Sequence, residues 1–171
     1  YAVGDLFDKK TLEQGTKGCD LIFHMAAYTK PWSEDPELPR LINVGGTVSI
    51  VEAAIKNNVK RVIITSTAGT MGYSIHGQIV DETTGSQQNL RTIYERSKAE
   101  AEMAALKYAN TKTEIIITNP SRIYGPGKLS KSNSLTKIIK WYVSGFWRIL
   151  PDNGNSIGNY VYIDDVVNGH I

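Results

Sequence analysis

The chain has 171 residues, of which 19 are Lys or Arg and 17 are Asp or Glu, so its net charge is +2. This length suits one domain with its own core, and the interspersed charges argue against a nucleic-acid or anionic-membrane partner. Cys19 is the single cysteine, so no disulfide forms within the chain, which suits a reducing, cytoplasmic setting. No apolar stretch reaches the roughly 20 residues of a membrane span, and the chain does not begin with a secretory leader. We therefore expect a soluble protein.

Helical and strand-like segments alternate along the chain. Short apolar runs rich in β-branched residues predict strands that are buried on both faces, and the segments between them have helical spacing. In chain order, we expect a helix at 11–18, a strand at 20–27, a helix at 41–57, a strand at 61–67, a helix at 93–110 and a strand at 113–118. This alternation predicts an α/β fold with a parallel sheet covered on both faces.

Tyr94 and Lys98 lie four positions apart near the start of the helix expected at 93–110, so their side chains can approach a common point. A phenol, with a usual pKa near 10, is a poor base at neutral pH. A nearby ammonium stabilises the phenolate and lowers that pKa, so the pair could give or take a hydroxyl proton. The same spacing also occurs in ordinary helices, and the pair alone does not decide the function.

Three hydroxyl side chains end the strand expected at 61–67: Thr65, Ser66 and Thr67. The small, turn-prone segment AGTMGY follows them. Ligands of a parallel sheet meet it where its strands end, so a substrate could be held at this point.

Together, these segments resemble the extended short-chain dehydrogenase/reductase family over nearly the whole chain. The similar branches are dihydroflavonol reductase-like, 3β-hydroxysteroid dehydrogenase-like and nucleotide-sugar epimerase proteins, which share a fold and a nicotinamide cofactor. The matching segments, in the family's order, are GDLFD (4–8), DLIFHMAA (20–27), NVGGT (43–47), TSTAGTMGY (65–73), YERSK (94–98), NPSRIYGPG (119–127) and YVYIDDVV (160–167).

The resemblance implies three catalytic residues. Tyr94 is the acid/base, and Lys98 holds the nicotinamide ribose and lowers the pKa of Tyr94. The hydroxyl of Thr67 orients the reacting oxygen. Thr67 is preferred because it is the last hydroxyl before the turn and because successive strand side chains face opposite ways. Ser66 is the reserve candidate.

The resemblance also implies a set of contacts to NAD or NADP, and it implies no metal site. Asp5 could instead only start a turn, and His24 could be a satisfied core histidine. Asn43 is expected to be structural, bonding backbone near the active-site strand. The implied cofactor residues are Asp5 at the adenine with Leu6 beside it, His24, Ala26 and Ala27 at the phosphate and ribose, Lys98 at the nicotinamide ribose, and Pro120 and Ser121 at the nicotinamide.

One part of a nucleotide-binding sheet does not occur in the sequence. The glycine-rich phosphate turn and the ribose-reading residue after it are not found. We therefore expect a doubly wound, Rossmann-like parallel sheet whose first βαβ unit is missing. Residues 1–125 would form the partial NAD(P)-binding domain, and residues 126–171 the beginning of a smaller substrate-binding lobe. The choice between NAD and NADP stays open.

The resemblance implies an NAD(P)-dependent oxidoreductase that moves a hydride between nicotinamide and a hydroxyl or carbonyl carbon of a small molecule. The alternatives are a nucleotide-sugar epimerase or dehydratase that retains its NAD, and a catalytically silent cofactor-binding sensor. TSTAGT (65–70) and WYVSGFWR (141–148) favour the reductase-like branch. The joint presence of Thr67, Tyr94 and Lys98 argues against the sensor. The substrate and a homodimeric assembly are left open.

Overall fold

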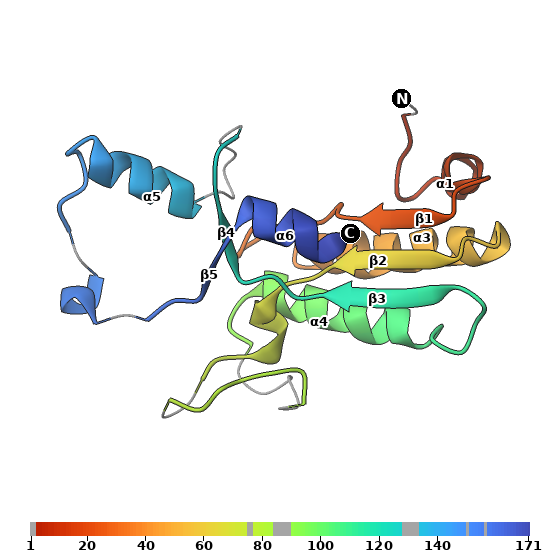
Figure 1. The fold of residues 1–171 in the computed structure, drawn as a ribbon. Coiled ribbons are helices and arrows are strands. Elements are labelled where there is room, and N and C mark those ends of the chain that lie inside the picture. Colours follow the sequence, from red (N-terminus) through yellow and green to blue (C-terminus); the bar gives the residue numbers. More distant parts are fainter. Residues whose placement is uncertain (1–2, 75–76, 84–89, 128–133, 150, 156) are drawn as a thin grey trace. The chain divides into compact units, whose positions relative to one another are not determined.

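The structure is a computed structural model that describes residues 3–74, 77–83, 90–127, 134–149, 151–155 and 157–171 (Figure 1). The chain divides into two compact units, Tyr1–Asn119 and Pro120–Ile171. The boundary predicted at residues 125 and 126 lies a few residues later than this division. The role of the second part as a substrate-binding lobe stays a prediction.

The first unit is built on a parallel sheet with the strand order β1-β2-β3. Its strands are β1 (Leu21–His24), β2 (Arg61–Thr65) and β3 (Glu114–Thr118). Because all three run in one direction, their carboxyl ends lie at the same edge of the sheet (Figure 1). The predicted α/β fold with a parallel sheet is confirmed.

Helices alternate with these strands, as predicted, and their ends differ by a few residues from the predicted ones. They are α1 (Lys9–Thr16), α2 (Glu37–Arg40), the π-helical turn η1 (Leu41–Gly45), α3 (Gly46–Lys56), the 3-10 turn η2 (Ala68–Met71) and α4 (Ile93–Leu106). Helix α3 contacts β1 and β2, and α4 contacts β3. Figure 1 shows both helices on the same face of the sheet.

The core lies between α3, α4 and the sheet. Fully burying a Val or Ile side chain contributes about 1.5–3 kcal/mol, so this cluster holds the sheet to its helices. Its buried members are Ile50, Val51, Ala54, Val59, Val62, Ile64 and Ala105.

Strands β1 and β3 depart from the prediction that the strands are buried on both faces. In β3, Glu114 is exposed and the other four residues are only half-buried. That prediction holds for β2, in which Val62, Ile63 and Ile64 are all buried. In β1, Leu21 is 40% exposed and Phe23 is 39% exposed, whereas His24 is buried. Successive side chains of a strand point to opposite faces, so β1 alternates, and the predicted cover on both faces is wrong for this strand.

Residues Glu37–Lys56 form one helical segment through α2, η1 and α3. Among the residues that the structure describes, this 20-residue segment is long and apolar enough to cross a membrane, with a mean hydropathy of 1.2. The prediction that no apolar segment reaches this length is therefore wrong by this measure. The core helix of a globular domain passes the same test, and α3 does bury Thr47, Ile50 and Val51 in the first unit.

The second unit holds a pair of short parallel strands. Its elements are β4 (Arg122–Tyr124), α5 (Ser134–Val143), the 3-10 turn η3 (Pro151–Gly154), β5 (Tyr160–Tyr162) and α6 (Ile163–His170). Tyr124 and Tyr162 meet edge to face, with their ring centroids 5.6 Å apart. Gly125 has a φ of 154°, and a Cβ there would lie 2.4 Å from Cγ2 of Ile163. Only glycine fits this turn without a shift of β5 and α6.

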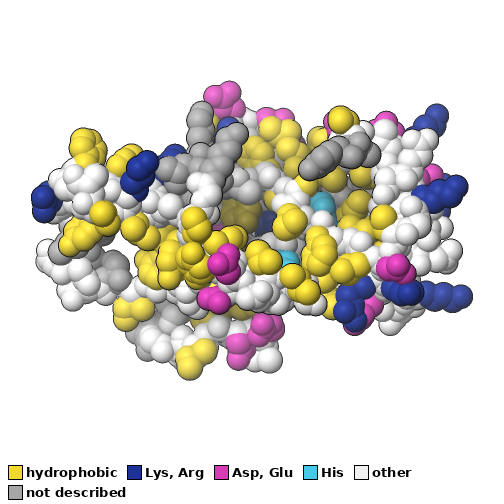
Figure 2. Space-filling view, turned by 45° about the horizontal axis from the view of Figure 1, so that its top comes forward, with side chains coloured by type: hydrophobic (Ala, Val, Ile, Leu, Met, Phe, Trp, Pro, Cys, Tyr) yellow, Lys and Arg dark blue, Asp and Glu magenta, His cyan; other side chains and the backbone are white. Residues whose placement is uncertain are grey.

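Charged side chains of both signs lie next to one another on the face shown in Figure 2. Lys60 pairs with Asp20 at 2.8 Å, and Arg61 pairs with Glu114 at 2.7 Å. These pairs are solvent-exposed, and such pairs contribute only about 0–1 kcal/mol. A mixed surface of this kind does not select a polyanionic partner.

Candidate active site

The end of β2 positions the hydroxyl side chains. The backbone stays extended through Thr67, and the N–H of Ser66 donates to the carbonyl of Thr118 at 2.7 Å, which prolongs the β2–β3 ladder. Because the chain is extended here, Ser66 and Thr67 point to opposite sides. Thr67 caps η2, and its Oγ1 accepts a hydrogen bond from the N–H of Gly69 at 3.2 Å.

The first turn of α4 positions Tyr94. Thr92 and Glu95 form a capping box: Oγ1 of Thr92 accepts from the N–H of Glu95 at 3.1 Å, and Oε2 of Glu95 accepts from the N–H of Thr92 at 2.9 Å. This reciprocal pair fixes where the helix starts. Oε1 of Glu95 also accepts from the hydroxyl of Tyr73 at 2.8 Å. The segment after Thr67 is thus tied to the helix that carries Tyr94.

Thr67 and Tyr94 meet through their side chains. Burial raises the pKa of the half-buried Tyr94, a hydrogen bond with the Thr67 side chain lowers it, and the charge of Glu95 raises it again. The net direction is upward, so the phenol is protonated at neutral pH. The net shift is opposite to the lowered pKa that was predicted for Tyr94, because the loss of water around the phenol outweighs the other effects. The contribution of Lys98 to this pKa stays a prediction.

Lys98 lies at the same end of β2. It is only 2% exposed, and its Nζ donates to the carbonyl of Thr65 at 2.8 Å. Burial lowers the pKa of Lys98, and the nearby carboxylate of Glu102 opposes that shift. The structure thus brings Thr67, Tyr94 and Lys98 together at the carboxyl edge of the sheet. Their catalytic roles stay a prediction.

His24 is a buried histidine at the end of β1. It is 4% exposed, and its Nε2 lies 3.1 Å from Oγ1 of Thr47. Burial, aided by the positive charge of Lys98, lowers the pKa of His24 to about 4, so the ring is neutral at physiological pH. These contacts are those of a satisfied core histidine, the alternative weighed for this residue. Its predicted contact with cofactor phosphate is not tested by them.

The stability of the protein should therefore depend on His24 as the pH falls. In the unfolded chain His24 takes up a proton near pH 6.5, and in the folded chain only near pH 4. The free energy of unfolding therefore falls by about 3 kcal/mol as the pH falls between these values. Above pH 6.5 His24 is neutral in both the folded and the unfolded chain, so it no longer makes the stability depend on pH. We expect His24→Gln to remove this part of the pH dependence, as measured by urea unfolding of the whole protein from pH 7 to pH 4. Parallel pH profiles for parent and variant would contradict the assignment.

The remaining predicted cofactor residues lie in several places. Oδ1 of the exposed Asp5 accepts from the N–H of Phe7 at 2.9 Å, which is the turn-forming role weighed as its alternative. Leu6 packs on the start of α3, where a Cβ on Gly46 would lie 2.8 Å from its side chain. Ala26 is exposed and Ala27 half-buried, and both follow β1 at the carboxyl edge.

Two further predicted contacts, Pro120 and Ser121, belong to the second unit and follow Asn119 directly in the chain. Asn43, in the turn η1, bonds backbone as predicted, and the backbone is that of Tyr28. Its Oδ1 accepts from the N–H of Tyr28 at 2.7 Å, and its Nδ2 donates to the carbonyl of Tyr28 at 3.1 Å. The same Nδ2 donates to Oγ of Ser97 on α4 at 2.8 Å.

Sequence reasoning missed two polar residues of this region, Glu102 and Asn119. Glu102 lies one helical turn after Lys98, a spacing that could have drawn attention to it. Asn119 directly follows β3, next to the hydroxyls that end β2. Both bond to the segment that carries Thr67.

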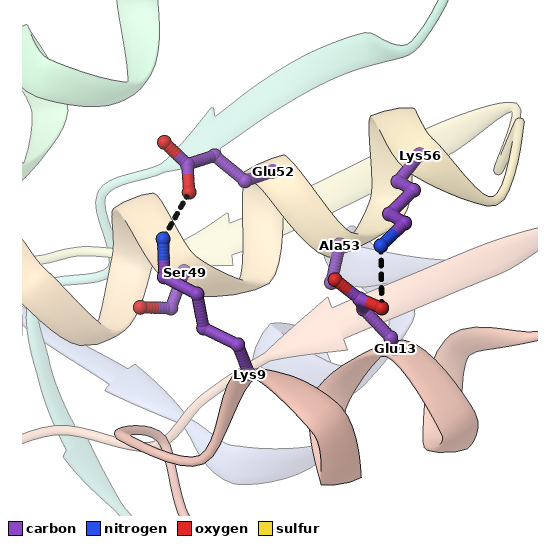
Figure 3. A pocket seen from close by; sticks show the side chains of 6 residues that line it. All are labelled: Lys9, Glu13, Ser49, Glu52, Ala53 and Lys56. Atoms are coloured by element: carbon purple, nitrogen blue, oxygen red, sulfur yellow. Dashed lines mark hydrogen bonds and ion pairs between the residues drawn. The ribbon is translucent and has the colours of Figure 1, made fainter.

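A pocket between α1 and α3 lies apart from these residues (Figure 3). Nζ of Lys9 pairs with Glu52 at 3.1 Å, and Nζ of Lys56 pairs with Glu13 at 2.6 Å. The charges that line the pocket therefore neutralise one another in pairs. None of the candidate catalytic residues lines it, so we do not place the active site there. Its lining residues are Lys9, Glu13, Ser49, Glu52, Ala53 and Lys56.

A parallel sheet whose carboxyl edge carries a hydroxyl, a phenol and a buried ammonium defines a Rossmann-like domain of the short-chain dehydrogenase/reductase type. Comparison with known proteins agrees with this class. The chain belongs to the NAD-dependent epimerase/dehydratase family, whose family model matches residues 2–171. The resemblance to extended short-chain dehydrogenases/reductases is thereby confirmed.

Several known proteins are similar to the chain. A putative dihydroflavonol 4-reductase from a Synechocystis species is 33% identical over 100% of this chain and 49% of its own length. Cinnamoyl-CoA reductase 1 from Petunia hybrida is 32% identical over 98% of this chain and 51% of its own length. A double mutant of the dTDP-glucose 4,6-dehydratase from Streptomyces venezuelae, crystallised with NAD, is 25% identical with a TM-score of 0.82, over 97% of this chain and 51% of that one. The chain thus spans about half the length of these relatives.

Proposed function

We propose that the whole protein is an NAD(P)-dependent oxidoreductase that transfers a hydride between nicotinamide and a hydroxyl or carbonyl carbon of a small molecule. The observation that carries this proposal is the position of the Tyr94 phenol, which is hydrogen-bonded to Thr67 where β2 ends and lies one helical turn before the buried ammonium of Lys98. The two reductases similar to the chain support the reductive direction.

The residues present fit a nicotinamide cofactor. The Lys98 ammonium has three N–H donors, of which the bond to Thr65 uses one, so it can also bind ribose hydroxyls. The exposed Asp5 and Ala26 and the half-buried Ala27 are the proposed contacts toward the rest of the dinucleotide, with Leu6 beside Asp5. His24 is a proposed phosphate contact, and because it is buried this contact has the least structural support of the set. Pro120 and Ser121 are the proposed nicotinamide contacts. The bound cofactor supplies or takes up the hydride, as NAD(P) does in its other enzymes.

The protein's own part in the reaction is proton transfer. In reduction, the Tyr94 hydroxyl donates its proton to the carbonyl oxygen of the substrate, which a raised pKa permits at neutral pH. The Thr67 hydroxyl bonds to that oxygen and to Tyr94, and so sets the direction of the transfer. The ammonium of Lys98 stabilises the phenolate that is left. Oxidation runs the same steps backwards.

A nucleotide-sugar epimerase or dehydratase is the second candidate, and the family description and the dehydratase crystallised with NAD support it. Such an enzyme returns the hydride to its own substrate. A catalytically silent sensor is the third candidate, and the Thr67–Tyr94 contact argues against it because proton transfer needs this contact and cofactor binding does not. We also propose a cytoplasmic setting, which the lone Cys19 supports.

The test is turnover by the whole purified protein with NADH or NADPH and a panel of dihydroflavonols, hydroxycinnamoyl thioesters, ketosteroids and nucleotide sugars. A reductase consumes the reduced cofactor in equal amount with its product, which the nicotinamide absorbance band reports. An epimerase or dehydratase forms product with no net change in that band. Cofactor binding without turnover of any member of the panel would favour the sensor and would overturn the proposal.

A further inference from the structure

The carboxylate of Glu102 lies behind the proposed catalytic residues. Glu102 stands on α4 one helical turn after Lys98, and it is half-buried. Its Oε1 accepts hydrogen bonds from Oγ of Ser66 and from Nδ2 of Asn119, the latter at 2.8 Å. One oxygen of α4 therefore joins the end of β2 to the end of β3.

These contacts hold Thr67 from both sides. The residue before it, Ser66, bonds to Glu102 through its side chain. The carbonyl of Thr67 itself accepts from Nδ2 of Asn119 at 3.2 Å and from Oγ1 of Thr70 at 2.8 Å. Thr70 is 1% exposed, and its Oγ1 also accepts from Asn119 at 3.1 Å. If Glu102 lost its acceptor oxygen, the donors of Ser66 and Asn119 would lose a shared anchor next to Thr67.

Glu102 also balances the charge of Lys98. The Lys98 ammonium interacts with the Thr65 carbonyl from β2, the neutral His24 from β1 and the Glu102 carboxylate from its own helix, and the proposed mechanism adds the Tyr94 phenol one turn earlier. Burial disfavours the charged form of Lys98, and of these three groups Glu102 is the one whose charge favours it.

We propose that Glu102 is a positioning residue, which holds the Thr67 hydroxyl against Tyr94 through Ser66 and Asn119 and serves as the counter-charge of Lys98. This inference rests on the proposed function for its kinetic consequence. Its structural part, the anchoring of residues 66–70, stands on the hydrogen bonds alone.

Two substitutions separate the two parts of this role. Glu102→Gln keeps an oxygen that accepts from Ser66 and Asn119 but removes the negative charge. We expect the alkaline limb of its kcat profile to move to lower pH, because Lys98 then loses its proton more easily. Glu102→Ala removes the anchor as well, and a displaced catalytic group can cost about 10²-fold in kcat. The matched control is Glu100→Gln on the same helix, whose carboxylate pairs with Arg40 at 2.8 Å on the surface.

Amide hydrogen exchange supplies a readout that does not depend on turnover. The N–H of Thr70 donates to the carbonyl of Thr67 at 3.1 Å, and the N–H of Gly69 donates to its Oγ1 at 3.2 Å. We expect both amides to exchange faster in Glu102→Ala and at the parent rate in Glu100→Gln. If Glu102→Ala does not fold, Ser66→Ala decides, because it removes the same bond to Glu102 from the other side and should also speed the exchange of both amides.

The outcomes distinguish the two proposals. A parent protein with no turnover overturns the proposed function, and the exchange rates then still decide the anchoring. An active parent whose Glu102 variants keep its kcat, pH profile and exchange rates overturns the positioning role and leaves the proposed function standing. Equal effects of Glu100→Gln and Glu102→Gln would also overturn the positioning role, since a general change in the charge of the helix would then explain both effects.

Discussion

Replacing Tyr94 with phenylalanine is expected to lower the kcat of the whole protein by about 10²–10⁴-fold, the usual contribution of a general acid or base. The variant loses only the phenolic oxygen, and the half-buried ring keeps its packing on the first turn of α4. The Kd of the nicotinamide cofactor should stay close to the parent value, because the lost hydroxyl acts on the substrate oxygen. Steady-state kinetics and a fluorescence titration with the reduced cofactor measure the two effects separately.

The pH profile gives this prediction a second, independent test. Burial raises the pKa of Tyr94 above 10.0, so the group is a proton donor throughout the neutral range. For the parent, kcat in the reductive direction should therefore be flat around neutrality and fall only at alkaline pH, where Lys98 or Tyr94 loses its proton.

A matched control is Tyr108→Phe, which removes a hydroxyl that bonds to Oε1 of Glu52 at 3.1 Å outside the site. Parent-like kcat is expected for this control. Parent-like kcat for Tyr94→Phe would return Tyr94 and Lys98 to an ordinary pair on one helix face.

Much of this site could be predicted from local sequence. The β-branched runs predicted the three strands, and the alternation of side chains in an extended chain separated Thr67 from Ser66. The structure bears out that separation in space, since Ser66 bonds to Glu102 and Thr67 bonds to Tyr94. Helical spacing likewise brought Tyr94 and Lys98 to the same end of β2. Each of these inferences depends on residues fewer than five positions apart.

The features that sequence reasoning missed depend on contacts between distant residues. Glu102 bonds to Ser66 across 36 positions, and Asn119 bonds to Thr67 across 52, so no local pattern predicts either bond. The direction of the Tyr94 pKa was wrong for a related reason. Burial is a property of the assembled fold, whereas the argument from Lys98 considered only the charge one helical turn away.

The role of Gly46 also depends on a contact with a distant residue. The sequence showed Gly46 only as part of NVGGT, and its role follows from Leu6, 40 positions away, whose side chain occupies the space of a Cβ. The packing of Leu6 on Gly46 sets the segment around Asp5 against the start of α3. It is thus a tertiary contact, and not a phosphate turn, that accounts for a small residue at this position.

Replacing Lys98 with methionine should impair both cofactor binding and turnover. Methionine fills a similar volume without charge, so the largely buried site keeps its packing while the ammonium is lost. Because that ammonium is proposed to hold the nicotinamide ribose, the KM of the cofactor should rise. Because it is also proposed to stabilise the phenolate of Tyr94, kcat should fall by about 10²–10³-fold, as when one preorganised donor at a developing charge is removed.

The combination of effects distinguishes this variant from Tyr94→Phe, which should change kcat alone. Lys98→Met also removes the hydrogen bond that Nζ donates to the carbonyl of Thr65 at 2.8 Å, and a typical hydrogen bond contributes about 0.5–1.5 kcal/mol. The loss of a buried charge offsets part of that cost, so the variant should still fold, which a thermal melt with and without cofactor would check. Lys107→Met, an exposed change just beyond α4, is the matched control and should behave as the parent. A folded Lys98→Met protein with parent-like kcat and cofactor KM would contradict both proposed roles, because the variant lacks the ammonium that both roles require.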